Sequence, residues 1–483
     1  MDIPLFFDTP TANEPFNQYA KEQGWDLETN HKLSSSPMWS PRVGFRWEIN
    51  GNRNYVLRGG VGVFTGRIPF VWLSNNFSNT GIQLSTFNTT NIKDLEQLTF
   101  ITDPNGQKAN TDKLAASGSQ TINVFTKDFK FAQTLRYNIA FDFALAGIDW
   151  TTEWLYSQSI NDVVYYNYAY DVDGQKNLSG VIKDNDYDER TYMKKVTDGT
   201  PFSNIYVLDN TNSGHTYSLS FSGKKKFNFG LSLTASYTHT NSVSVNSGTS
   251  SVAQSNYNYN YIRRNPNNPE IGRSAYNFPH RVTASVTYAK DYAKHWKTTV
   301  SLIYTGTSGA PYCIYYNGDL NGDGSNSNDL FFIPTDEQLD KMEFLVDEKG
   351  KYTPEEQRAN MKAWIAADDY LSEHRGEYYE RFADNEDFEN HFDFHFAQQF
   401  KFNAGKHTRT IELSFDILNI SNMFSPEWGR YASAAGSYTY YNPVTFDAKT
   451  CQYQFLHPAD YNMRSYSDYY SRWRGQIGLK YIF

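Results

Sequence analysis

The chain ends in the stretch RWRGQIGLKYIF, residues 472–483, in which large apolar side chains recur at every second position. These alternating positions are Ile477, Leu479, Tyr481 and Phe483. Because successive side chains of a β-strand point to opposite faces, the alternation predicts a strand with one apolar and one polar face. Chain ends are usually polar and frayed. A strand that stays aromatic to its last residue therefore needs an apolar neighbour.

The same two-residue period recurs along the whole chain. In QTLRYNIAFDFAL, residues 133–145, every odd position from Leu135 to Leu145 is large and apolar, and the even positions are small or polar. We expect about eleven strands of this kind, near 42–49, 54–64, 131–145, 148–157, 215–223, 229–241, 278–289, 296–305, 390–402, 408–419 and 472–483. The chain is therefore predicted to be all-β.

The length and composition of these strands favour a membrane barrel. Strands of soluble proteins average about 5–6 residues, whereas a tilted strand crosses a bilayer with about 9–11 residues, and several predicted strands reach that length. Their polar faces consist mostly of Ser, Thr and Asn, as suits a lumen. The chain contains 37 Tyr among its 483 residues, and a tyrosine ring has an apolar body with a polar tip that suits a membrane interface.

The connections between the predicted strands alternate between short and long. The long ones lie near 66–130, 158–214, 242–277, 306–389 and 420–469. Short turns on one side and long loops on the other are typical of an outer-membrane barrel, with periplasmic turns and extracellular loops. The pattern predicts a transmembrane antiparallel β-barrel in the cell outer membrane, in contact with its lipid.

The odd number of strands implies that this barrel is larger than the segments identified. Bacterial single-chain barrels have even strand numbers, and an open sheet edge in lipid leaves backbone groups unsatisfied. If the last strand runs toward the periplasm, an odd count makes the first strand run the same way. We therefore expect a C-terminal barrel portion. The start, MDIPLFFDTPTANEPF, also lacks the pattern of a signal peptide.

Four segments resemble parts of Oar-like TonB-dependent receptors. Residues 40–81 (SPRVGFRWEINGNRNYVLRGGVGVFTGRIPFVWLSNNFSNTG) resemble a mid-barrel segment, and residues 317–334 (NGDLNGDGSNSNDLFFIP) resemble a late acidic loop. Residues 412–425 (ELSFDILNISNMFS) resemble the penultimate strand, including Asn419 and Asn422. The terminal GQIGLKYIF, residues 475–483, is similar to the signal read by the barrel-assembly machinery.

This resemblance implies a 22-stranded barrel, closed by a plug and driven by the TonB complex, of which residues 1–483 would be the C-terminal half. A plug, a TonB box and a signal peptide are not found in this sequence. The implied transport therefore requires a complete barrel with its plug, and coupling to TonB requires an N-terminal region outside these residues. The substrate, and whether a lipoprotein partner covers the barrel, stay open.

One loop has the spacing of a calcium ligand set. Asp319, Asn321 and Asp323, followed by Gly324, match the first six positions of the pattern D-x-[DN]-x-[DN]-G. The glutamate expected at position 12 is replaced by Leu330, so Asp329 or Asn328 would have to substitute. The alternative is a cluster of Asx-turns in a polar surface loop. The sequence thus predicts a structural Ca²⁺ site at Asp319, Asn321, Asp323 and Asp329, or such a cluster.

Other features of the sequence are less specific. A capping box at Thr353–Glu356 predicts a helix that ends near Gly376, inside the long loop 306–389. No catalytic constellation or other cofactor motif appears, so we expect no enzyme, and the net charge of -9 argues against a nucleic-acid partner. A secreted or surface β-rich adhesin or glycan-binding protein is the alternative to a transporter.

Overall fold

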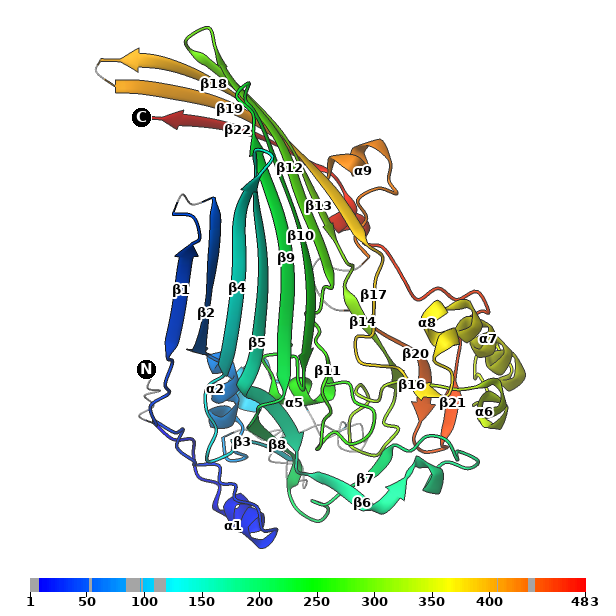
Figure 1. Cartoon of the computed structure of the whole chain (residues 1–483). Helices are drawn as coiled ribbons and strands as arrows, with labels where there is room; N and C mark the ends of the chain where they lie inside the picture. Colours follow the sequence, from blue (N-terminus) through cyan, green and yellow to red (C-terminus); the bar gives the residue numbers. More distant parts are fainter. Residues whose placement is uncertain are drawn as a thin grey trace.

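The computed structural model describes residues 8–51, 54–83, 96, 99–107, 119–405, 407–432 and 439–483. One large, curved antiparallel sheet dominates it, and the long connections gather at one end of this sheet (Figure 1). Within the described residues, no helix has both the length and the apolar character that a membrane crossing demands.

The sheet contains 14 strands, and eleven of them neighbour one another in chain order, which confirms the eleven predicted strands. They are β1 (Arg42–Glu48), β2 (Tyr55–Thr65), β4 (Gln133–Leu145), β5 (Ile148–Asn167), β9 (Gly214–Lys226), β10 (Leu231–Ser244), β12 (His280–Tyr292), β13 (Trp296–Thr307), β18 (Glu389–Ala404), β19 (His407–Leu418) and β22 (Arg474–Ile482). The predicted end of the fourth strand at residue 157 is wrong, because β5 continues to Asn167 by pairing with β8 (Phe202–Thr211).

The register places most of the large apolar side chains of the eleven strands on one face, although Val56, Phe64 and Ile303 lie on the other. Leu413 lies opposite Leu479, and Phe415 lies opposite Ile477. The opposite face is polar, and its charged groups pair across strands; Arg58 Nε, for example, lies 3.0 Å from a carboxylate oxygen of Asp142. We call these eleven strands the wall. A shift of one residue would reverse the two faces of a strand, so the common apolar face shows that the strands of the wall are paired in a consistent register.

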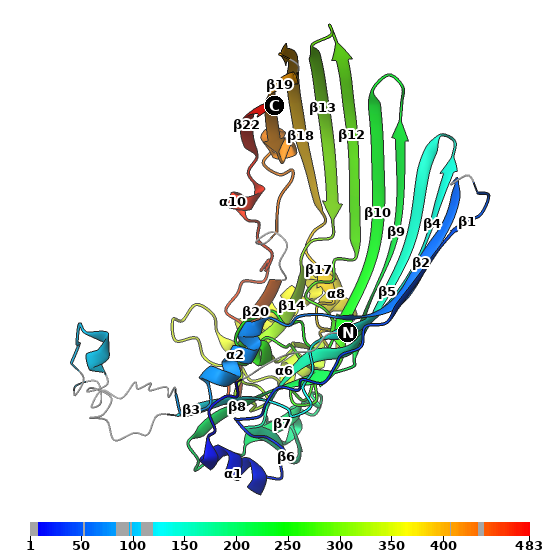
Figure 2. The ribbon, with the colours of Figure 1, turned by 90° about the vertical axis from the view of Figure 1, so that its left-hand side faces the viewer.

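The two outer strands of this sheet, β1 and β22, have no partner on their outer sides within the described residues. The sheet therefore has the shape of an open trough, seen in Figure 2 with β22 and β1 at its two margins. Strands β1 and β22 both run from the long-loop end toward the short-turn end, because nine antiparallel strands separate them.

Tight turns join the strands at the end opposite the long loops. Ala146 and Gly147 join β4 to β5 with φ values of 58° and 69°. Two successive positive φ values are typical of a type I′ turn, which matches the twist of the strands that it connects. In the three-residue connection between β12 and β13, Ala293 and Lys294 also have positive φ values.

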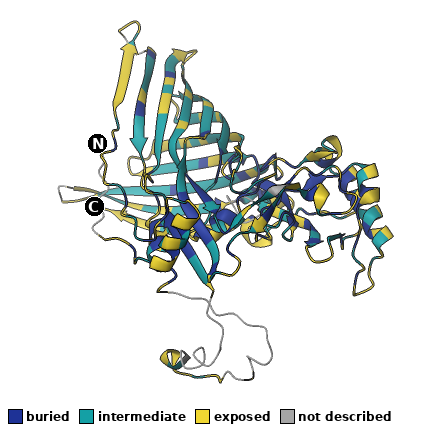
Figure 3. Ribbon diagram, turned by 90° about the horizontal axis from the view of Figure 1, so that it is seen from below, coloured by how far each residue is buried: buried dark blue, intermediate teal, exposed yellow. Residues whose placement is uncertain are grey.

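Most of the described parts of the long connections pack together into what we call the loop region. Figure 3 shows buried residues concentrated there, whereas β1 is exposed along most of its length. The elements found outside the eleven strands are α1 (Glu14–Glu22), α2 (Phe70–Ser78), η1 (Pro104–Gln107), β3 (Gln120–Phe125), β6 (Tyr170–Asn177), η2 (Leu178–Gly180), β7 (Thr191–Lys195), β8, α5 (Ala253–Asn258), β11 (Gly272–Arg273), β14 (Pro311–Asn317), β15 (Phe332–Ile333), α6 (Asp336–Lys341), α7 (Pro354–Ala367), α8 (Asp369–Glu373), β16 (Glu377–Tyr378), β17 (Asp384–Asn385), α9 (Ile420–Phe424), β20 (Thr439–Asp447), β21 (Gln452–Gln454) and α10 (Asp468–Ser471).

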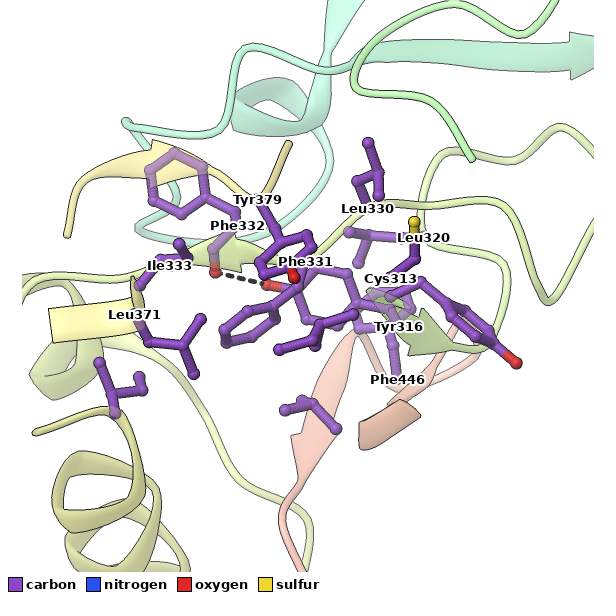
Figure 4. Packing of buried hydrophobic residues seen from close by; sticks show 14 of the residues in the cluster. Cys313, Tyr316, Leu320, Leu330, Phe331, Phe332, Ile333, Leu371, Tyr379 and Phe446 are labelled. Atoms are coloured by element: carbon purple, nitrogen blue, oxygen red, sulfur yellow. Dashed lines mark hydrogen bonds between the residues drawn. The ribbon is translucent and has the colours of Figure 1, made fainter. Parts of the chain in front are cut away.

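The loop region has its own hydrophobic core. Its largest cluster joins residues from four long connections, among them Leu178, Tyr261, Phe331 and Phe446. Figure 4 shows Tyr316 and Phe331 at the centre of this cluster, where the Tyr316 hydroxyl donates a hydrogen bond to the carbonyl oxygen of Phe332 at 3.2 Å. Apolar burial of this extent fixes the long loops against one another.

The helix predicted from Thr353 to near Gly376 is interrupted. The capping box forms as expected, with Thr353 accepting from the backbone N–H of Glu356. Asp368, however, adopts an extended conformation with φ -97° and ψ 124°, which ends α7, and its side chain then caps α8. An aspartate side chain competes for nearby backbone N–H groups, and this local bond replaces the continued helix.

Candidate functional site

The acidic loop at residues 319–329 lies buried within the loop region. Asp323, Asn328 and Asp329 are all fully buried, and so is Asn321. Asp319 accepts hydrogen bonds from the backbone N–H groups of Gly322, Asp323 and Gly324 at 2.7–3.0 Å. The sequence therefore forms the tight, carboxylate-centred turn that its aspartate and glycine spacing predicts.

Asp323 and Asp329 are also bound by neighbouring groups. Asp323 accepts from Ser325 N at 2.7 Å and from Asn328 Nδ2 at 2.6 Å. Asp329 accepts from Leu320 N at 3.0 Å. The side-chain oxygen of Asn328 has no hydrogen-bond partner, although Asn328 points at the Asp323 carboxylate through its amide nitrogen. A buried amide oxygen without a donor is a group that a cation would satisfy.

A guanidinium group from another loop approaches this turn. Arg190 is fully buried, and its Nη1 lies 3.0 Å from Oδ1 of Asp329. Its Nη2 donates to the carbonyl oxygen of Leu330 at 2.6 Å, and the Asp188 carboxylate lies 3.7 Å away. Arg190 thus joins the segment after η2 to the acidic loop, more than a hundred residues further along the chain.

One guanidinium does not balance the carboxylates around it. Burial, together with the neighbouring carboxylates of Asp329 and Asp319, raises the pKa of Asp323 well above its usual range. Burial also raises the pKa of Asp329 to about 6, although Arg190 acts in the opposite direction. Removing carboxylates from water disfavours their charged forms unless cations lie nearby. The cluster therefore favours protonation or an added cation.

The structure brings the four predicted calcium-site residues into one turn without arranging them around a common point. Their oxygen atoms face backbone N–H groups, Asn328 or Arg190. Among the described residues, no group of three or more His, Cys, Asp or Glu side chains has the arrangement of a metal site. Cation binding here would require the Asn328 amide and the carboxylates to turn inward.

Of the predicted assembly-signal residues, Ile477, Leu479 and Tyr481 lie on the apolar face of β22, and Phe483 directly follows that strand. Ile477, Leu479, Tyr481 and Phe483 are exposed by 75 %, 78 %, 54 % and 87 %. The rings of Tyr481 and Phe483 stack with centroids 6.3 Å apart. Gln476 and Lys480 occupy the other face, opposite Asp416 and Glu412 of β19.

A polar pocket lies where the polar face of the wall meets the loop region. It encloses 460 Å³ and includes Arg136, Ser157, Asp162, Thr216, Ser242 and Tyr276 in its lining. The register of β5, β9 and β10 places Ser157, Thr216 and Ser242 side by side on the polar face. Hydroxyl, carboxylate and guanidinium groups together offer both donors and acceptors to a polar ligand.

A second ionic cluster fastens the last long loop. Arg464 Nη1 lies 3.1 Å from Asp387, its Nη2 lies 3.6 Å from Asp384, and its Nε lies 3.9 Å from the buried Glu386. The Tyr441 hydroxyl donates to Glu386. This cluster holds residues 441–464 against the segment that leads into β18.

Three polar residues of β18 have separate partners. His395 Nδ1 contacts the Asp416 carboxylate, the ring of His391 stacks on Tyr431 with centroids 4.0 Å apart, and Asp393 accepts from Asn419 N at 2.8 Å. Asn419 itself has a φ of 53° and donates through Nδ2 to Gly429 O and Ser471 O. Asparagine tolerates the left-handed region, and this conformation of Asn419 allows the backbone to turn into α9.

The two cysteines are unpaired. Cys313 is buried, and its sulfur accepts a hydrogen bond from Phe382 N at 3.0 Å, whereas Cys451 is partly exposed.

Sequence reasoning missed Arg190, Arg381 and Arg464 as central groups of the loop region. No local pattern marks them, because each has a partner at least 70 positions away: Asp329 for Arg190, the Val245 carbonyl for Arg381 and Asp387 for Arg464. A buried arginine becomes visible only when the partner loops are placed in space.

Solved structures of outer-membrane receptors resemble parts of this chain. They include the ferric enterobactin receptor PfeA mutant (R480A_Q482A) of Pseudomonas aeruginosa, with 7 % identity over 80 % of this chain and a TM-score of 0.35. The siderophore receptor PirA of Acinetobacter baumannii shows 10 % identity over 82 %, with a TM-score of 0.35. The outer membrane transporter YddB of Escherichia coli shows 11 % identity over 91 %, with a TM-score of 0.39. The chain spans only 35 %, 38 % and 40 % of the lengths of these three proteins.

No curated protein matches the sequence. A family described as "Outer membrane beta barrel domain" matches residues 7–447, which is most of the chain. The eleven registered strands, with one continuous apolar face, have the architecture that such a domain requires. The chain therefore belongs to the outer membrane beta barrel domain family, and its location is the cell outer membrane.

Proposed function

We propose that this chain is the C-terminal half of a 22-stranded, Oar-like TonB-dependent transporter. The observation that carries the proposal is the relation between the sheet's two margins: β1 and β22 run in the same direction and have no described outer partner. An antiparallel closure then requires an odd number of additional strands, since the strand next to β1 and the strand next to β22 must both run the opposite way. Eleven further strands would give 22, an even total.

A second copy of the same half does not meet this requirement in one membrane. If both copies point their long loops to the same side, β22 of one copy meets β1 of the other in parallel. Reversing one copy would put long loops on both sides of the membrane. The closing strands are therefore proposed to come from a region that precedes this one in the complete receptor, together with a plug and a segment that contacts TonB.

The polar pocket at Arg136, Asp162 and Thr216 is proposed to contact the transported substrate. It lies on the face assigned to the lumen, at the end from which the long loops emerge. Its mixture of charged and hydroxyl groups suits a polar substrate, and the loop region would form the mouth above it. The barrel-assembly machinery is proposed to read the terminal Ile477, Leu479, Tyr481 and Phe483.

Adjacent cysteine substitutions test which face meets lipid. Leu233 and Thr234 are neighbours on β10 with opposite orientation. In a variant with Cys313 and Cys451 replaced by Ser, Leu233→Cys should react with a lipid-phase probe and Thr234→Cys with a water-soluble maleimide. Equal aqueous labelling at both positions, or recovery of a soluble monomer without detergent, would favour the adhesin alternative. Transport itself is tested by comparing substrate uptake in cells with and without TonB.

We also propose a structural Ca²⁺ at Asp319, Asn321, Asp323 and Asp329. The supporting observations are the fully buried carboxylates of Asp323 and Asp329, which outnumber the single Arg190 guanidinium, and the unpartnered oxygen of Asn328. The ion would stabilise the loop region and take no part in transport chemistry.

A further inference from the structure

Two histidines face each other at the long-loop end of the wall, on the neighbouring strands β10 and β12 (Figure 1). His239 lies directly opposite His280 in the antiparallel register. The centroids of their rings are 5.1 Å apart, and the ring planes are inclined by 40°. Because alternate residues of a strand share a face, both histidines lie on the face of Leu233 and Tyr237. The pair therefore interrupts the apolar face of the wall.

Strand length places the pair at the edge of the hydrocarbon layer. His280 is the first of the 13 residues of β12, which ends at Tyr292 beside a short turn. A tilted strand crosses the bilayer with about 9–11 residues, so the ends of a 13-residue strand extend past the hydrocarbon. The side chain of His280 is exposed. An ion dissolved in water can therefore reach the two imidazoles.

The separation of the two rings suits a shared metal ion. Histidine nitrogens bind Zn²⁺ at about 2.0–2.1 Å, and each ring centre lies roughly 1 Å behind its nitrogen. Two imidazoles at tetrahedral positions of one ion then have centroids about 5 Å apart. The 5.1 Å between the rings of His239 and His280 matches this value. Imidazole ligands favour divalent transition metals, whereas Ca²⁺ favours oxygen ligands.

A neighbouring tyrosine orients one of the two rings. The hydroxyl oxygen of Tyr237 lies 2.8 Å from Nδ1 of His280. When Nδ1 carries the proton and donates it to this oxygen, Nε2 presents its lone pair to a metal, and metal-bound histidines usually hold their second nitrogen in this way. His239 contacts the rings of Tyr217 and His280, and its side chain forms no hydrogen bond within the described residues. Both imidazoles are therefore available as ligands.

We propose that His239 and His280 together bind one divalent transition-metal ion, such as Zn²⁺ or Cu²⁺, on the outer surface of the wall. Among the described residues, no third His, Cys, Asp or Glu completes a larger metal site, so water would occupy the other coordination positions. Strand β10 ends at Ser244, and β12 begins at His280. The ion would therefore join the two strands at the base of the connection 245–279 and restrain this loop.

Pulsed electron paramagnetic resonance of bound Cu²⁺ tests the proposal, because it counts the imidazoles that bind the ion. The full, untagged chain, with Cys313 and Cys451 replaced by Ser, is folded in detergent with excess Ca²⁺ and receives one equivalent of Cu²⁺. We expect two bound imidazoles in this parent protein. His239→Ala and His280→Ala should each show one imidazole and bind Cu²⁺ at least about tenfold more weakly, since the second contact is no longer intramolecular. Fewer than two imidazoles in the parent protein, or two in either variant, would overturn the assignment.

Matched variants separate this pair from general binding by histidines. His215 lies on the same face without a histidine opposite it, so His215→Ala should leave two bound imidazoles and an unchanged affinity. Tyr237→Phe removes the hydroxyl beside Nδ1 of His280 and should weaken binding about tenfold. Zn²⁺ should slow protease cleavage within residues 245–279 of the parent protein but not of His239→Ala. An equal effect of Zn²⁺ on both proteins would contradict an ion that joins the two strands.

Discussion

Arg190 and Asp329 form an ion pair in which both side chains are fully buried, with Nη1 and Oδ1 3.0 Å apart. This pair joins two long loops that are separated by more than a hundred residues. Removing one partner of a buried pair leaves the other as an uncompensated charge, which costs about 3–5 kcal/mol. The loop region should therefore depend on Arg190 far more than on its exposed ion pairs.

Arg190→Met is expected to destabilise the loop region by about 3–5 kcal/mol while the wall still assembles. The measurement is the temperature at which protease cleaves the long loops of the membrane-inserted protein. Arg264→Gln, which removes an exposed pair with Glu189, should change this temperature little, since such pairs contribute about 0–1 kcal/mol. Equal effects of the two substitutions would show that the buried pair has no special role.

Of two adjacent residues of β12, one should tolerate substitution by arginine and the other should not. Val286 lies on the apolar face opposite Leu302, and Ser285 lies on the polar face. Val286→Arg should cost about 2–4 kcal/mol if that face meets lipid, whereas Ser285→Arg should leave folding nearly unchanged. The folded fraction after insertion into vesicles, read from heat-modifiable migration, gives the comparison. Tolerance of Val286→Arg would argue against a lipid-facing surface.

Phe483→Ala, or deletion of Phe483, should reduce the amount of protein assembled in the outer membrane. The ring is 87 % exposed, stacks on Tyr481 and lies 6.0 Å from the Arg409 guanidinium, so its removal should affect recognition during assembly more than final stability. Surface labelling and heat-modifiable migration measure the effect. Lys480→Ala, on the opposite face of the same strand, is the control, and unchanged surface levels of the Phe483 variants would contradict the prediction.

Calcium binding to the acidic loop is tested by isothermal titration of the folded protein. The wild type should bind one Ca²⁺ per chain, and Asp323→Ala should abolish binding because Asp323 is the central buried carboxylate. Absence of heat in both samples would rule out the site. In that case Arg190 and protonation alone would balance the charges.

Glu386 should make the attachment of the last long loop sensitive to pH. Burial raises the pKa of Glu386 above its usual value, although Tyr441 and Arg464 oppose this effect. A carboxyl with a raised pKa in the folded state stabilises that state fully below its ordinary pKa of about 4.3, and this stabilisation is lost as the pH rises through the raised value. Protease cleavage between residues 441 and 464 should therefore increase as the pH rises through that interval.

Glu386→Gln should remove this pH dependence, because the amide stays neutral. Asp387→Asn, at an exposed neighbour of the same arginine, is the control and should retain it. A Glu386→Gln protein with the wild-type pH profile would assign the dependence to another group.

The strands of the wall could be predicted from the sequence because the alternation of apolar and polar side chains is a local, periodic pattern. Each strand alternates between a lipid-compatible and a polar face, so residues such as Leu135–Leu145 report their own orientation. The continuation of β5 to Asn167 was not predictable in this way. Beyond residue 157 the strand enters the loop region, where Val163, Val164 and Tyr165 are buried in succession and the period disappears.

The contacts of the loop region were also beyond sequence reasoning. The turn at Asp319 could be predicted, because its bonds reach only five residues. Its partner Arg190 could not, because nothing near that arginine in the chain indicates which distant carboxylate it will meet. The break of α7 at Asp368 is an intermediate case. A capping aspartate competes with continuation of the helix, and the free-energy difference between the two conformations is too small to be judged from the sequence.

Strand β5 joins part of the loop region to the wall without a break in its backbone hydrogen bonding. Over its 20 residues it is bonded first to the wall strands β4 and β9 and then to β8, without an interruption between the two. A motion of the β8 segment would therefore have to bend β5, whose hydrogen bonds continue into the wall. Strand β13, in contrast, ends at Thr307, and the next strand, β14, begins at Pro311. Residues 308–388 are therefore attached through side-chain packing and through contacts such as that of Arg381 with the Val245 carbonyl, whereas the β8 segment is attached through a continuous strand.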